Sequence, residues 1–137
     1  GADSKVALKE KKDRIEDAIH ATKAALKEGI VAGGGVALLN AANSIKAKSV
    51  GEQMLLDAIK APYKTILDNA GLDYLDLNKK GWGIDVITGK PANMIKAGII
   101  DPVLVTKSAL KNAVSVVTTI ISADCIISNK RLDHASN

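Results

Sequence analysis

Apolar residues recur every three or four positions along much of the chain, a spacing that predicts amphipathic helices. The clearest case is 4–28, where Ile15 and Ile19 belong to one apolar stripe and charged residues fill the opposite face. Asp3 or Ser4 can cap the start of this helix, because their side-chain oxygens accept hydrogen bonds from free amides of the first turn.

Two further helices are expected, from about 35 to 45 and from about 51 to 69, separated by the polar loop 46–53. Pro62 interrupts the second of these patterns and should kink the helix or begin a new turn. The sequence Asn-Ala-Gly at 69–71 is typical of a helix end.

The chain changes character over 72–95, where glycine and proline surround a short apolar stretch. This pattern predicts a β-hairpin with its bend near 88–91. A short helical turn over 92–97 is expected to follow it.

The last long segment opens with Asp101 and Pro102, which favour the N-cap and first position of a helix. The β-branched run 114–121 has strand propensity, but no turn signal interrupts the segment for about 20 residues, longer than an ordinary strand. We therefore predict a buried helix to about residue 123 and a short strand at 125–128.

These elements predict a mainly α fold, a bundle of long helices with a small β-hairpin. A chain of 137 residues is long enough for one sizeable core. Aromatic residues are only 2% of the chain, so the core must consist mainly of aliphatic side chains. Scarce aromatic residues also argue against single-stranded nucleic-acid binding, which uses base stacking. The tail 129–137 is expected to be frayed.

The charge pattern indicates a solvated helix face rather than a nucleic-acid surface. Residues 1–28 carry seven basic and six acidic side chains, and the net charge of the chain is +4. The single cysteine, Cys125, cannot form an internal disulfide, which fits a reducing compartment, and we expect it to be buried. The charged start of the chain does not resemble a signal peptide, and no apolar run approaches the roughly 18–20 residues of a membrane span.

Three consecutive glycines, Gly33–Gly35, interrupt the helical pattern within an apolar stretch. They can form a plain turn, allow a close helix crossing, or expose backbone N–H groups to an anionic or polar ligand at a helix N-terminus. The cluster matches neither the P-loop spacing nor the dinucleotide fingerprint, so all three interpretations stay open.

Several motifs in order resemble the group I chaperonin subunit, the bacterial GroEL type. They are KEKKDRIEDAIHATKAALKEGIVAGGGVALL (9–39), GEQMLLDAIKAPYKTILDNAG (51–71), GWGIDVITGKPANMIKAGIIDP (81–102) and VTKSALKNAVSVVTTIISADCII (105–127). The resemblance covers nearly the whole chain, and it implies that 1–28 is an intermediate-domain helix and 29–137 the C-terminal half of the equatorial ATP-binding domain.

The resemblance also implies an ATP site. Its matching positions are the catalytic Asp17 and the nucleotide-binding Gly34, Asp85, Val86, Ile87 and Asp101. Val86 and Ile87 are bulkier than the small residues of many members, so only their backbone contacts carry over.

Two of these positions also have a simpler interpretation. Asp101 is equally explained as a helix cap, and Asp17 as one charged residue on a solvated helix face. His20 has no second ligand at helical spacing and is not expected to bind metal.

The family's phosphate loop and Mg²⁺-binding aspartate do not occur in this sequence, nor does its apical domain. ATP and Mg²⁺ are the implied cofactors, and the isolated chain is expected to be inactive alone. The implied partners are identical subunits in a ring, a co-chaperonin lid and non-native polypeptides. Nucleic acid and membranes are not expected as partners. The implied location is the cytoplasm or an organelle matrix. The alternative is a non-catalytic helical module that self-associates or binds other proteins.

Overall fold

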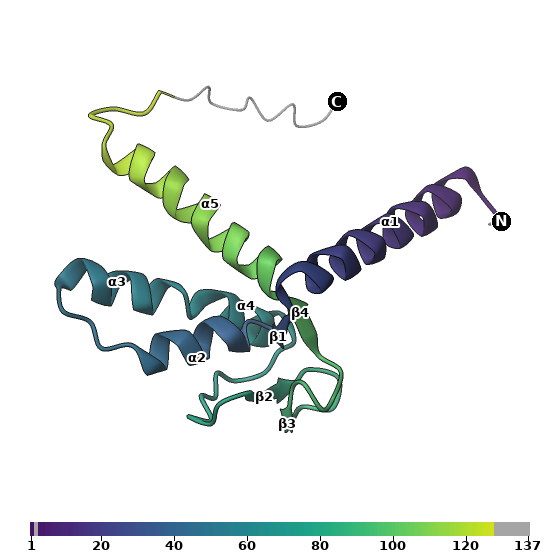
Figure 1. Ribbon diagram of the computed structural model, residues 1–137, viewed down its shortest axis with the longest axis horizontal. Helices are drawn as coiled ribbons and strands as arrows, with labels where there is room; N and C mark the ends of the chain where they lie inside the picture. The colour runs from purple at the N-terminus through teal and green to yellow at the C-terminus, as the bar shows by residue number, and fades with distance from the viewer. Residues whose placement is uncertain (2, 128–137) are drawn as a thin grey trace, which may run out of the picture.

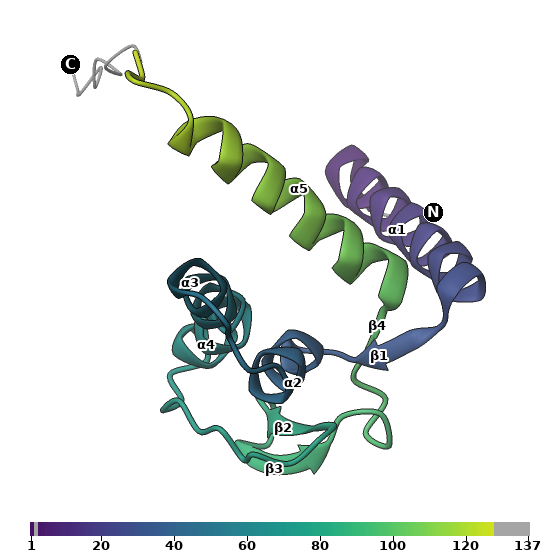
Figure 2. The ribbon, with the colours of Figure 1, turned by 60° about the vertical axis from the view of Figure 1, so that its left-hand side comes forward.

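The computed structural model describes residues 1 and 3–127, so the predicted tail at 129–137 lies outside the described residues. Two long helices, α1 (Lys5–Glu28) and α5 (Val103–Ile121), extend from a short two-stranded ladder (Figure 1). The ladder pairs β1 (Ile30–Ala32) with β4 (Ile100–Pro102) in antiparallel orientation. Figure 2 shows a smaller body of helices and a hairpin on the other side of this ladder.

The α1 helix has the predicted ends. Ser4 Oγ accepts a hydrogen bond from the amide of Ala7 at 3.1 Å, and Gly29, with φ 85°, ends the helix. The Gly29 amide donates to the carbonyl of Ala25 at 2.8 Å. Both caps satisfy backbone groups that a helix leaves without intrahelical partners.

The smaller body contains three helices of nine residues each: α2 (Val36–Ser44), α3 (Val50–Ala58) and α4 (Ala61–Asn69). The single helix predicted over 51–69 is therefore wrong in part, although a new turn at Pro62 was one of the two expected outcomes. Pro62 occupies the first turn of α4, where its missing N–H costs nothing, and its ring would clash with the carbonyl four residues earlier in a continuous helix.

The predicted hairpin is confirmed. Strand β2 (Trp82–Asp85) pairs with β3 (Lys90–Asn93), and residues 86–89 form the bend. A turn over 94–98 follows and leads to β4, close to the helical turn expected at 92–97.

The core is mainly aliphatic, as the composition predicts, with one aromatic residue at its centre. Tyr63 is 1% exposed, and its hydroxyl donates a hydrogen bond to the carbonyl of Leu75 at 3.0 Å. Burial raises the pKa of the Tyr63 phenol. The main core cluster contains Ala32, Val36, Leu39, Tyr63, Leu67, Ile84 and Met94.

The glycine cluster lies where other parts of the chain approach its backbone. A Cβ on Gly35 would lie 2.7 Å from the backbone N of Tyr63 and 2.8 Å from its Cα. A Cβ on Gly33 would lie 3.0 Å from the backbone N of Ile100. These distances support the close helix crossing, because α4 begins against the start of α2 only if residue 35 lacks a side chain.

The start of α5 differs from the prediction. Asp101 is not its N-cap, because residues 100–102 form β4 and the helix begins at Val103 without a side-chain cap. The Val103 amide donates instead to the carbonyl of Gly29 at 3.1 Å. Pairing with β1 holds this segment extended, which overrides the local preference of Asp-Pro for a helix start.

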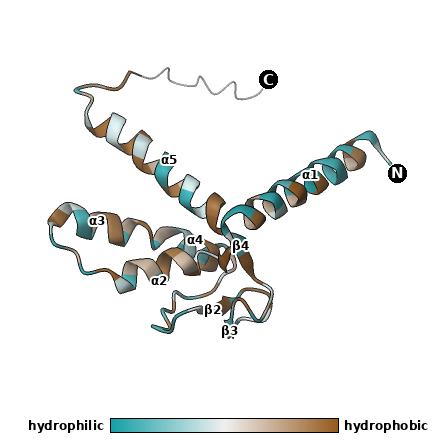
Figure 3. Ribbon diagram, in the orientation of Figure 1, coloured by the Kyte–Doolittle hydropathy of each residue, from teal (hydrophilic) through white to brown (hydrophobic). Residues whose placement is uncertain are grey.

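The predicted burial of α5 is wrong. None of its residues is buried, and apolar side chains such as Val116 and Ile121 are exposed. Figure 3 shows hydrophobic residues along α5. Residues 125–127 of the predicted strand at 125–128 form no strand, and Cys125 is exposed rather than buried. Residue 128 lies outside the described residues.

Within the part of the chain that the structure describes, α5 is long and apolar enough to cross a membrane, with a mean hydropathy of 1.2. The expectation that no apolar run approaches this length is therefore wrong for α5, although Lys107 and Lys111 interrupt its apolar sequence. Core helices of globular proteins pass the same test of length and composition, so the finding is weak evidence for a membrane span.

We expect Gly35→Ala to lower the free energy of unfolding by about 1–3 kcal/mol more than Gly71→Ala. Both glycines have positive φ, 78° and 69°, but a Cβ on Gly71 would meet nothing within 4 Å. The difference therefore isolates the clash with Tyr63. Urea denaturation of both variants measures it, and equal losses would show that the close approach is not a packing constraint.

Candidate functional site

The β1–β4 ladder brings Asp101 close to the glycine cluster. Asp101 pairs with Val31, and the Gly33 amide donates to the carbonyl of Ile99 at 2.9 Å, which continues the pairing into the cluster. Since Gly34 follows Gly33 directly and Asp101 lies two residues after Ile99, the ladder places Asp101 near the glycine cluster.

The carboxylate of Asp101 is available to a ligand. The residue is partly buried, and its side chain forms no hydrogen bond or ion pair with any residue between 3 and 127. An ionised carboxylate accepts hydrogen bonds through two oxygens, so Asp101 can hold a ligand hydroxyl group.

The start of α2, which follows the strand paired with Asp101, offers free donors. No side chain caps the helix, and among the described residues the amides of Gly34 and Gly35 donate to no carbonyl oxygen. Uncapped N–H groups at a helix N-terminus carry partial positive charge and bind polar or anionic groups. The pair of Asp101 and these amides therefore combines an acceptor with donors.

The hairpin residues predicted for the site lie at the end of β2 and in the bend. Asp85 accepts hydrogen bonds from the amide of Ile87 at 3.0 Å and from Thr88 Oγ1 at 2.9 Å. Its carboxylate therefore closes the turn. Val86 is 42% exposed and Ile87 is 92% exposed, so these side chains are open to solvent.

Sequence reasoning missed two residues that connect the hairpin to the glycine cluster. A Cβ on Gly83, within β2, would lie 2.6 Å from Met94 Cε, and a Cβ on Gly34 would lie 3.5 Å from the same atom. A glycine inside an apolar strand signals a close approach, and Gly83 could have been found in this way. The sequence holds no comparable signal for Met94.

Asp17 lies apart from the other candidates. Its side chain is exposed. A helical rise of 1.5 Å per residue places it about 16 Å along α1 from Glu28, the last residue of the helix, next to the ladder. It shares a helix face with Ala21 and Ala24, four and seven residues later, and Ala24 is the buried residue of α1. At the base of this arm, Lys107 Nζ donates to Glu28 Oε2 at 2.7 Å. The structure thus brings Gly34 and Asp101 together but not Asp17.

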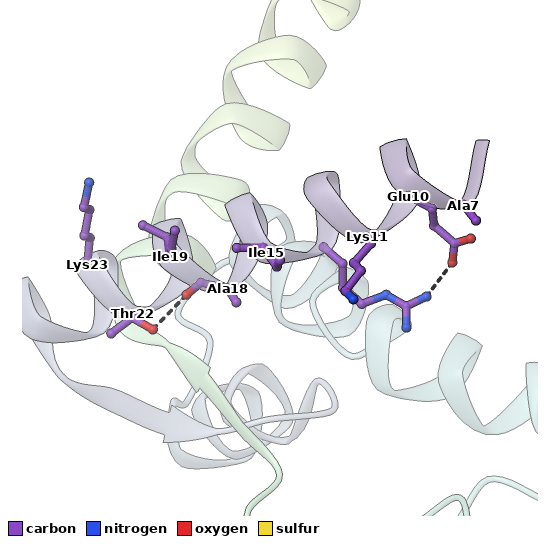
Figure 4. Close-up of a pocket in the computed structure, with 9 residues that line it drawn as sticks. Ala7, Glu10, Lys11, Ile15, Ala18, Ile19, Thr22 and Lys23 are labelled. Carbon is purple, nitrogen blue, oxygen red and sulfur yellow. Dashed lines mark hydrogen bonds and ion pairs between the residues drawn. The ribbon is translucent and has the colours of Figure 1, made fainter. Parts of the chain in front are cut away.

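The hollows in the described part of the chain do not coincide with this set. An open groove of about 960 Å³ runs along α1 and is lined by residues of that helix alone, including Ile15, Ala18 and Ile19 (Figure 4). A second hollow of about 500 Å³ lies between β1, α2 and the hairpin. Neither is lined by any of the six predicted site residues. Residues 1 and 3–127 also hold no group of three or more His, Cys, Asp or Glu side chains that could bind a metal.

Comparison with known proteins gives two findings. The model of the TCP-1/cpn60 chaperonin family matches residues 1–131. The structure is also similar to that of a group III chaperonin in the open state, with a TM-score of 0.77 and 27% sequence identity. The match covers 93% of this chain and 30% of that chaperonin, so the chain spans less than a third of its length.

We expect Asp101→Ala to change the free energy of unfolding by no more than about 0.5 kcal/mol, because the carboxylate has no partner among the described residues. Ser49→Ala is the matched control, since Ser49 Oγ caps α3 by accepting from the amide of Glu52 at 3.2 Å. Its loss should cost about 1 kcal/mol. Thermal unfolding of both variants measures the difference. A loss at Asp101 as large as that at Ser49 would restore its role as a cap.

Proposed function

Because the chain belongs to the TCP-1/cpn60 chaperonin family, we propose that it forms part of an ATP-dependent chaperonin subunit of the group I (GroEL) type that assists protein folding. The observation that carries the nucleotide site is that β4 holds Asp101, whose carboxylate has no partner among the described residues, opposite the strand that leads into the amides at the start of α2. The motifs quoted from the sequence support the group I assignment.

We propose that 1–28 is an intermediate-domain helix and 29–137 the C-terminal half of an equatorial domain. Figure 1 shows α1 directed away from the smaller body, which supports this division, and α1 contacts the rest of the chain at α5 and β4. Gly29, with φ 85°, joins the helix to β1, and glycines tolerate the backbone rotation that a hinge requires. In this proposal α1 is the moving arm.

The nucleoside part of ATP binds at the glycine cluster, where Asp101 accepts hydrogen bonds from its hydroxyl groups and the Gly34 backbone contacts it. The backbone of Asp85, Val86 and Ile87 lines the base. One carboxylate, Asp101, and the backbone amides of the glycine cluster fit the hydroxyl groups of a nucleoside better than a metal ion. The Mg²⁺ ligand is therefore expected elsewhere in the subunit. Mg²⁺, when bound, neutralises phosphate charge.

The role of Asp17 is to orient the attacking water. A carboxylate needs only to reach hydrogen-bond distance of that water to accept its proton. Since Asp17 lies about 16 Å along α1 from the ladder end of the helix, the arm must rotate before hydrolysis. Such closure also excludes bulk water from the reaction.

The proposed partners are identical subunits in a ring, a co-chaperonin lid and non-native polypeptides, in the cytoplasm or an organelle matrix. The exposed apolar surface of α5 supports assembly with further protein, since large exposed apolar patches are typical of interaction sites. The same observation favours the second candidate function, a helical module that self-associates without nucleotide. Light scattering with and without ATP distinguishes them, because such a module would not respond to ATP.

In a complete subunit that carries this sequence, we expect Asp17→Ala to leave ATP affinity nearly unchanged and to slow hydrolysis by about 10²–10⁴-fold. The matched control is Asp13→Ala, an exposed aspartate one turn earlier on α1. It should leave both quantities unchanged. Calorimetric ATP binding and steady-state phosphate release measure the two effects. A collapse of affinity with a normal rate would contradict the role assigned to Asp17.

The isolated chain of 137 residues should show no measurable ATPase activity, since the motifs of the family's phosphate loop and Mg²⁺-binding aspartate are absent from this sequence. Phosphate release in the presence of Mg-ATP is the measurement. A turnover comparable to that of an intact chaperonin would show that the chain itself contains a complete phosphate site.

A further inference from the structure

The side chain of Met94 fills the space between the glycine cluster and strand β2. It is 1% exposed, and its Cε lies 3.5 Å from the position of a Cβ on Gly34 and 2.6 Å from that of a Cβ on Gly83. The terminal methyl group therefore occupies space that a side chain on Gly83 would need, and it lies next to the space that a side chain on Gly34 would take. A side chain on Gly83 would displace it.

The backbone of Met94 is fixed from two sides. Its amide donates to the carbonyl of Gly81 at 3.0 Å, just before β2, and its carbonyl accepts from the amide of Ile99 at 2.9 Å, just before β4. Since the Ile99 carbonyl in turn accepts from the Gly33 amide, Met94 is two hydrogen bonds away from the glycine cluster. Its side chain therefore extends from an anchored position.

We propose that Met94 is a positioning residue of the nucleotide site: its side chain sets the separation between the Gly34 backbone and the hairpin that carries Asp85, Val86 and Ile87. The inference rests on the proposed function. Both walls of that site lack side chains where Met94 approaches them. Val36 Cγ2 also lies near Gly83 and Ile99 Cγ2 near Gly34, but Met94 Cε is the atom that lies near both glycines.

The unbranched shape of methionine matters for this role. Leucine has a similar volume but ends closer to the backbone, so it cannot extend as far as the methionine methyl group. Volume-conserving exchanges between leucine and methionine usually preserve the fold. Met94→Leu therefore separates positioning from stability, while Met94→Ala removes the contact and leaves a cavity.

The test compares Met94→Leu and Met94→Ala with Leu67→Ala in a complete subunit that carries this sequence. Leu67 is 0% exposed in the same core cluster, and none of its atoms is among those nearest to the Cβ positions of Gly34 and Gly83. It therefore controls for the loss of a buried side chain. Titration with Mg-ADP should show the dissociation constant raised about tenfold or more by Met94→Ala relative to Leu67→Ala. Met94→Leu should raise it by a smaller factor with nearly unchanged thermal unfolding.

A second measurement needs no nucleotide. Amide hydrogen exchange of the peptides containing Gly34 and Gly83 should be faster in both Met94 variants than in Leu67→Ala. If Met94→Ala does not fold, Met94→Leu carries both comparisons. Equal Mg-ADP affinity in the Met94 and Leu67 variants would overturn the inference. A wild-type subunit that binds no Mg-ADP would instead overturn the proposed function, and the exchange data would then show whether Met94 still spaces the two segments.

Discussion

The close approach of two segments, at α4 and β4, to the backbone of Gly33 and Gly35 is the constraint on which the rest of the structure depends. The start of α4 lies against Gly35, and the backbone of Ile99 and Ile100, at the start of β4, lies against Gly33. Packing in protein interiors is dense enough that a single added methyl group at such a contact forces a backbone shift. Because α2, α4 and the β1–β4 ladder all meet here, a shift would disturb the main core and the ladder together.

The same constraint explains why the candidate site lies at this point. The N-terminus of α2 leaves amides without intrahelical partners, and the ladder pairs Asp101 with Val31, three residues before Gly34. Structural packing and ligand access are therefore two uses of one glycine cluster. Asp17 lies outside this arrangement, on α1. The C-terminal end of α1 leads into the β1–β4 ladder and is linked to α5 by the ion pair of Glu28 with Lys107. Chemistry that involves all three positions requires motion of α1.

Sequence reasoning succeeded where local chemistry decides the outcome and failed where distant contacts do. The Ser4 cap, the end of the first helix at residue 28 and the hairpin follow from residues that are close to one another in the sequence. Asp101 has the chemistry of a helix cap, but β1 lies beside it in space and recruits it into a strand. The burial predicted for α5 was wrong because an apolar composition predicts that a helix needs a partner surface but does not say which segment supplies it. None of the described residues buries α5.

The sequence by itself determined the mainly helical fold and the presence of a glycine cluster between helices, and its motifs carry the resemblance to chaperonins. These depend on residue type and spacing along the chain. Only the tertiary structure decided what approaches the glycines, that Asp101 is left without a partner among the described residues, and that Met94 lies between Gly34 and Gly83. Such facts arise from contacts between segments tens of residues apart, and no local pattern encodes the distance between them.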